Sequence, residues 1–150
     1  MNITVIGADR PLGAALAAGL GPEFEVTAIG QMAAEGCRAV DILERDALDA
    51  ALAGAGAVVL AAAFDAEADS EQELLDMAAR GAYVALTAAV AAGSGRVVLI
   101  SRLDLLRDYP ERYAIDPQWN PIPRANAQEL VPLLAELTGR EIARKGEIEV

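Results

Sequence analysis

The chain has 150 residues, 54% of them hydrophobic and only 4% aromatic, and this length suits one domain with a sizeable buried core. Its formal net charge of −11 argues against a nucleic-acid partner, which would need clustered lysine and arginine. The lack of histidine and the single cysteine exclude histidine-based catalytic triads and zinc sites built from imidazole or thiolate ligands, so no metal site is expected.

Membrane and secretion signals are also not expected. The uncharged run at residues 50–64 is broken by two glycines and is too short to cross a bilayer. The N-terminus shows no basic region ahead of an apolar stretch, which a signal peptide would need. One cysteine fits a reducing compartment, so we expect a cytoplasmic protein without membrane contact.

The first half of the chain alternates short apolar runs with helical patterns. Pro11 suits the first turn of a helix, and Gly21 ends that helix. The predicted strands cover residues 3–6, 23–29 and 37–42, and the predicted helices cover residues 11–20 and 46–53.

The second half continues the alternation. Ser70, with Glu73 three residues later, forms a capping box that predicts a helix start. Residues 102–123 are rich in proline, tyrosine and charge, which indicates an irregular loop, and the closing "EIEV" predicts the start of a sixth strand. The predicted strands cover residues 57–62 and 96–101, and the predicted helices cover residues 71–92 and 126–145.

Fully apolar short strands that alternate with helices indicate a parallel sheet covered on both faces. We therefore predict an α/β protein with a three-layer Rossmann fold, a doubly wound parallel sheet with helices on both faces. Residues 1–150 are expected to form a single domain.

The turn after the first strand is a candidate phosphate site, because backbone N–H groups at a helix N-terminus attract a pyrophosphate. A dinucleotide fingerprint spaced G-x-x-G-x-x-G would place glycines at positions 7, 10 and 13. Gly7 and Gly13 fit, for a tight turn and for close packing of the helix on the strand. Arg10 stands where the middle glycine would be, so its side chain either crowds the phosphates or pairs with one. The glycines alone equally fit a turn without any ligand.

Three ordered segments carry a family resemblance: "NITVIGADRPLGAALAAGLGPEFEVTAI", "VDILERDALDAALAGAGAVVLAAA" and "RGAYVALTAAVAAGSGRVVLIS". Together they resemble the NAD-dependent epimerase/dehydratase branch of the short-chain dehydrogenase/reductase superfamily. The resemblance covers residues 1–101 well and the remainder loosely. It implies a Rossmann fold that binds NAD or NADP.

The resemblance also implies a set of cofactor contacts. Asp41 and Ile42 match the family's aspartate and aliphatic residue that contact adenine after the third strand. The "GAGAVVLAAA" segment places Ala61, Ala62 and Ala63 beside the nicotinamide ribose. The pyrophosphate would lie on the first turn, at Gly7, Asp9, Arg10, Pro11, Leu12 and Gly13.

The choice between NAD and NADP depends on the end of the second strand. An NAD enzyme would place Asp or Glu there to hold the ribose hydroxyls, and this chain has Gly30-Gln31. Without that acid a 2′-phosphate is not repelled, and Arg10 or Arg38 could meet one. The sequence therefore favours NADP slightly over NAD.

The family's catalytic pair is missing. Active members use Tyr-x-x-x-Lys on the last long helix, but the only lysine here is Lys145, and Glu141 precedes it by four residues. Ser101 matches a strand-end serine of the family and is better read as structural. The catalytic residues are therefore unknown. Three hypotheses stay open: oxidoreductase or epimerase chemistry on atypical residues, a non-catalytic NAD(P)-sensing or partner-binding module, and a scaffold in which Arg10 abolishes binding.

The resemblance has consequences for assembly. Family members often dimerise through two long helices, which predicts a homodimer through residues 71–92 and 126–144. Members also continue into a C-terminal substrate-binding segment that this chain lacks. The chain is then either an excised nucleotide-binding half or a short natural form, and the substrate is not identified.

Overall fold

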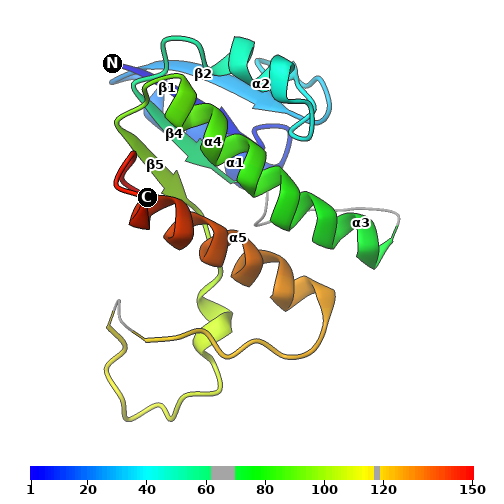
Figure 1. Cartoon of the computed structure of the whole chain (residues 1–150), viewed down its shortest axis with the longest axis vertical. Helices are drawn as coiled ribbons and strands as arrows, with labels where there is room; N and C mark the ends of the chain where they lie inside the picture. The colour runs from blue at the N-terminus through cyan, green and yellow to red at the C-terminus, as the bar shows by residue number, and fades with distance from the viewer. Residues whose placement is uncertain (62–69, 117–118) are drawn as a thin grey trace.

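A computed structural model describes residues 1–61, 70–116 and 119–150 of the chain (Figure 1). In these residues one five-stranded parallel sheet runs in the order β3-β2-β1-β4-β5, which confirms the predicted doubly wound α/β fold. The strand order reverses between β1 and β4: β2 and β3 follow on one side of β1, and β4 and β5 lie on its other side. The strands are β1 (Asn2–Ile6), β2 (Glu25–Gly30), β3 (Arg38–Ala39), β4 (Ala57–Leu60) and β5 (Arg96–Leu99).

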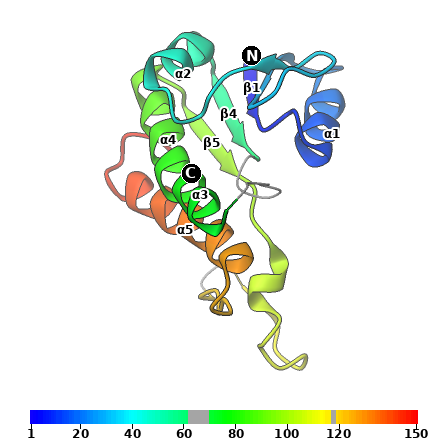
Figure 2. The same cartoon turned by 90° about the vertical axis from the view of Figure 1, so that its right-hand side faces the viewer.

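Helices cover both faces of the sheet, as predicted. Figure 2 shows α1 on one face and α2, α4 and α5 side by side on the other. A π-helical turn, Met77–Gly81, joins α3 to α4, and a short 3₁₀ turn, Leu103–Leu106, lies in the expected irregular loop. The helices are α1 (Pro11–Leu20), α2 (Arg45–Leu52), α3 (Glu71–Asp76), α4 (Ala82–Ala91) and α5 (Ala127–Arg144).

The core divides along the pleat of the sheet, because successive strand residues point to opposite faces. Val5 and Val59 are buried on the α1 side, where Leu16 packs against them. Ile6 and Leu60 point the other way, into a larger cluster with residues of α2, α4 and α5. The apolar runs that predicted strands therefore supply both halves of the core.

Two strands differ from the prediction. The run at residues 37–42 forms only a two-residue strand, because the chain turns where the Asp41 carboxylate accepts the N–H of Leu43 at 2.9 Å. The closing "EIEV" forms no strand among the described residues. It makes one isolated bridge, in which the carbonyl of Glu149 accepts the N–H of Val97 at 2.7 Å.

The predicted long helix after Ser70 is present but interrupted. The Ser70 hydroxyl accepts the N–H of Glu73 at 3.2 Å, which confirms the predicted cap. The π-helical turn Met77–Gly81 then separates α3 from α4. By length and composition alone Glu71–Ala91 could cross a membrane, and in this fold it packs over the sheet between α2 and α5.

Candidate functional site

The turn after β1 is tight and closely packed. Gly7 has a φ of 92°, which favours glycine, and the N–H groups of Gly7 and Ala8 both bond to the carbonyl of Ile29. A Cβ on Gly13 would lie 2.0 Å from the carbonyl oxygen of Gly7. Both glycines therefore have the structural roles that their spacing predicts, and they hold the N-terminus of α1 against the end of β1.

Arg10 is the N-cap residue of α1. Its carbonyl accepts the N–H of Ala14 at 2.9 Å, and its own N–H donates to Gly7 at 3.2 Å. Pro11 takes the first helical position, as predicted. The first turn of α1 contains no acidic residue, so the partial positive charge of the helix N-terminus is not offset from within the helix.

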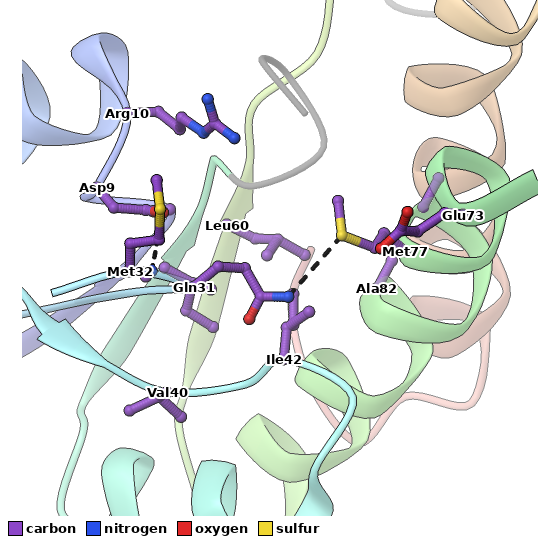
Figure 3. A pocket seen from close by; sticks show the side chains of 14 residues that line it. Asp9, Arg10, Gln31, Met32, Val40, Ile42, Leu60, Glu73, Met77 and Ala82 are labelled. Atoms are coloured by element: carbon purple, nitrogen blue, oxygen red, sulfur yellow. Dashed lines mark hydrogen bonds between the residues drawn. The ribbon is translucent and has the colours of Figure 1, made fainter. Parts of the chain in front are cut away.

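A cavity of about 250 Å³ opens at the carboxyl ends of β1, β2 and β4. This is the edge of a doubly wound sheet where ligands bind, close to the reversal of strand order. Figure 3 shows Asp9 and Arg10 on one side of it and Glu73, Met77 and Ala82 on the other. Among the described residues, the lining comprises Ile6, Gly7, Asp9, Arg10, Gly30, Gln31, Met32, Val40, Ile42, Leu60, Glu73, Met77, Ala78 and Ala82.

The carboxylate of Asp9 lies against the end of β2. It accepts the N–H of Met32 at 3.2 Å, and a Cβ on Gly30 would come within 2.0 Å of its Oδ1. Glycine at position 30 therefore makes room for this side chain. The sequence favoured NADP slightly because no acidic residue follows the second strand. The Asp9 carboxylate lies at that place in the fold, so this argument for NADP no longer holds.

The same carboxylate affects the neighbouring cysteine. Burial raises the pKa of the Cys37 thiol above its ordinary value, and the negative charge of Asp9 raises it further. A buried thiol with a raised pKa stays neutral and acts as a small apolar side chain. Cys37 is part of the core cluster on the α1 side of the sheet.

A contact across the cavity joins β2 to the helical layer. The side-chain amide of Gln31 donates to the sulfur of Met77 at 3.9 Å, drawn as a dashed line in Figure 3. Met77 begins the π-helical turn, a feature that is frequent at functional sites. Gly81 ends that turn, and a Cβ there would be 3.2 Å from Cγ2 of Ile42. The turn thus brings the helix close to the wall of the cavity.

The residues predicted by resemblance are only partly brought together. Ile42 is buried and lines the cavity, but Asp41 is exposed and its carboxylate is engaged by the N–H of Leu43. Ala61 is buried and donates its N–H to the carbonyl of Ile6 at 2.9 Å, outside the lining. Ala62 and Ala63 lie outside the described residues. Pro11 and Leu12 belong to α1 and do not line the cavity.

Several lining residues were missed by the sequence analysis. Ala78 and Ala82 follow each other at helical spacing and could have been recognised as one face of a helix above the strand ends. Gln31 and Met32 directly follow β2, which is where a ligand is expected. The other lining residues not predicted as part of the site are Ile6, Gly30, Val40, Leu60, Glu73 and Met77.

At the end of β5 and on α5, where a catalytic pair would lie, the side chains form a serine–glutamate–arginine network. The hydroxyl of Ser101 donates to the carboxylate of Glu136 on α5, whose other oxygen is 3.6 Å from Arg140. Tyr109 donates its hydroxyl to the carbonyl of Asn120 at 3.0 Å. The Ser101 contact joins the end of β5 to α5, which agrees with the structural reading of this serine.

Comparisons with known proteins give similarity of structure only. No protein-family model and no curated protein sequence matches this chain. A short-chain dehydrogenase/reductase superfamily protein from Agrobacterium tumefaciens, solved with bound NAD, matches with a TM-score of 0.85 at 24% identity over 100% of this chain and 48% of its own.

Two further solved structures have the same fold. Uronate dehydrogenase from Agrobacterium tumefaciens matches with a TM-score of 0.81 at 22% identity, over 96% of this chain and 56% of its own. A dTDP-glucose 4,6-dehydratase from Streptomyces venezuelae, solved with NAD, matches with a TM-score of 0.77 at 22% identity, over 99% of this chain and 53% of its own. This chain therefore has the same Rossmann fold as these solved structures, as predicted, and spans about half their length.

Proposed function

We propose that this chain is a dinucleotide-binding Rossmann domain that takes NAD(H) in the cavity at the carboxyl ends of β1 and β2. The observation that carries the proposal is the junction of this cavity with the glycine turn and the N-terminus of α1. In Rossmann folds, a pyrophosphate binds where a glycine turn places a helix N-terminus beside a cavity at the strand ends.

The residues present fit such a ligand. Backbone N–H groups at the start of α1 would face the pyrophosphate, and the Arg10 side chain would add a positive charge beside it. Val40 and Ile42 on one side and Ala78 and Ala82 on another would form the apolar walls of an adenine slot. Small-molecule sites of this kind combine apolar walls with a few convergent polar groups.

The similar solved structures support the proposal. The superfamily protein from Agrobacterium tumefaciens and the dehydratase from Streptomyces venezuelae both contain NAD. Both share the fold of this chain over nearly its whole length, which supports a dinucleotide as the ligand of its strand-end cavity.

Equilibrium titration with NADH, followed by fluorescence, tests the proposal. We expect saturable binding with a Kd at or below about 1 mM, or about −4.1 kcal/mol. Met77→Trp would enlarge a lining side chain and weaken binding at least tenfold. Ala91→Trp, at an exposed position at the end of α4, is the matched control and should bind like the wild type. Absence of binding in the folded wild type would overturn the proposal.

As a second proposal, we infer that this chain binds a dinucleotide without catalysing a reaction. The hydrogen bond of the Ser101 hydroxyl to Glu136 favours this proposal. The hydroxyl of Ser101, which matches a strand-end serine of the family, donates to Glu136, and no tyrosine in the chain precedes a lysine by four residues. We therefore expect no change in NADH absorbance when the NAD-loaded protein is incubated with uronates and nucleotide sugars. Turnover with any of them, lost in Ser101→Ala, would establish catalysis instead.

A further inference from the structure

Asp9 brings a carboxylate to a place that the sequence of β2 leaves without one. In dinucleotide-binding Rossmann domains, an acidic residue near the end of the second strand binds the adenosine ribose hydroxyls and disfavours a 2′-phosphate. Here that strand ends at Gly30, followed by Gln31. The Asp9 side chain lies over Gly30 and accepts the N–H of Met32, so a carboxylate reaches the end of β2 from the preceding turn.

We propose that Asp9 is the specificity-determining residue of the site, binding the ribose hydroxyls of NAD(H) and excluding NADP(H). The inference rests on the proposed dinucleotide function and adds to it the residue that determines the choice between NAD(H) and NADP(H). Asp9 lines the cavity and is only partly buried, so its side chain can contact a ligand there. An ionised carboxylate accepts from both ribose hydroxyls and repels a phosphate in their place.

The other charges at the cavity point the same way. Among the residues that the structure describes, its lining contains two carboxylates, Asp9 and Glu73, and one guanidinium, Arg10. With NAD(H), the Arg10 guanidinium can pair with the pyrophosphate, which both cofactors contain. A further dianionic phosphate would add negative charge to a lining whose described charges already sum to −1, in a chain with a net charge of −11.

The main alternative is that Asp9 only closes the turn after β2 through Met32. Asp9→Asn separates the two roles, because the amide oxygen still accepts an N–H while the charge is lost. We expect wild-type protein to bind NADH at least about tenfold more tightly than NADPH. Asp9→Asn should shift that ratio toward NADPH by at least about tenfold, or about 1.4 kcal/mol.

A relocation variant gives a second measurement. In Asp9→Gly/Gly30→Asp, the carboxylate moves to β2 and the side chain that would collide with it is removed. We expect this double variant to recover the preference for NADH that Asp9→Gly alone loses. Asp46→Asn, an exposed charge change on α2, is the control and should leave the ratio unchanged.

The outcomes distinguish the two levels of inference. A wild type that binds neither cofactor overturns the proposed function and with it the role of Asp9. A wild type that binds NADH, with Asp9→Asn retaining the ratio, overturns the role of Asp9 alone. Equal wild-type affinities for NADH and NADPH do the same. A shifted ratio in Asp9→Asn, restored by relocation of the acid, supports the proposal.

Discussion

Arg10 is the residue at which two opposing effects meet. As N-cap of α1 it stands at the turn where a pyrophosphate would approach the backbone, and its side chain lines the cavity. Its bulk takes room from the ligand, while its charge attracts the anion. Because an arginine side chain is long and can rotate away from the backbone, attraction should prevail.

We expect Arg10→Gly to weaken binding of NADH. A charge-assisted contact to phosphate contributes roughly 1.5–3 kcal/mol, so affinity should fall at least tenfold in a fluorescence titration. Arg45→Ala, which removes a guanidinium from α2 outside the cavity lining, is the control. A tenfold gain of affinity in Arg10→Gly would instead identify Arg10 as an obstruction.

Glu129 connects the irregular loop to α5. Its carboxylate accepts the N–H of Arg124 at 2.7 Å and pairs with Arg107, and it is only 5% exposed. The hydrogen bond from the Arg124 N–H, with help from the charge of Arg107, lowers the pKa of Glu129 below its ordinary 4.5. The folded state therefore favours the ionised carboxylate.

This lowered pKa predicts how stability depends on pH. The contribution of Glu129 is fully present above its ordinary pKa of 4.5 and is lost as pH falls through the lower pKa of the folded state. Glu129→Gln should be less stable than wild type near neutral pH, and the two should converge on acidification. Urea unfolding at a series of pH values measures this. A constant difference down to about pH 3 would contradict the assignment.

At the scale of elements, the packing of α1 depends on one glycine. Gly13 faces the carbonyl of Gly7 so closely that a Cβ would lie 2.0 Å from its oxygen, whereas a Cβ on Gly19 of the same helix would meet nothing within 4 Å. The two positions are a matched pair in one helix.

We expect opposite effects of alanine at these positions. Gly13→Ala should destabilise the protein by at least the roughly 1–3 kcal/mol typical of overpacked sites, because the obstacle is backbone. Gly19→Ala should stabilise it by about 0.5–1 kcal/mol through helix propensity. Urea midpoints report both changes. Equal stabilities would show that α1 does not need the close approach.

At the scale of the whole molecule, the predicted homodimer concerns the helical layer opposite α1. The two helical segments proposed for the interface each expose a large side chain: Tyr83 on α4 is 52% exposed and Leu137 on α5 is 46% exposed. Apolar and aromatic side chains at the centre of an interface are buried when two copies associate.

We expect sedimentation at roughly 10–50 µM to give the mass of two chains, because association depends on concentration. Leu137→Glu should shift the protein toward one chain by placing a charge in the interface. Leu103→Glu, at a 78% exposed position outside both helices, is the control. A wild-type mass of one chain in this range would refute the dimer.

The fold could be predicted more completely than the site. The bounds of α1 and the caps at Ser70 and Asn126 depend on residues close together in sequence, and local rules describe them well. The site could be predicted where the glycine turn or the family resemblance pointed to a residue, as at Gly7, Asp9, Arg10 and Ile42, which all line the cavity. The adenine role of Asp41 stays a prediction, since its carboxylate bonds locally to Leu43.

The sequence by itself determined the alternation of strands and helices, the glycine turn and the absence of a Tyr-x-x-x-Lys pair, because these are properties of neighbouring residues. Only the tertiary structure decided where the carboxylate of Asp9 lies and which side chains close the cavity. Asp9 meets Met32 across 23 positions, and Gln31 meets Met77 across 46. Such contacts depend on how strands and helices pack around Gly30 and Gly81, where the missing Cβ leaves room for a distant side chain, and no local pattern records that room.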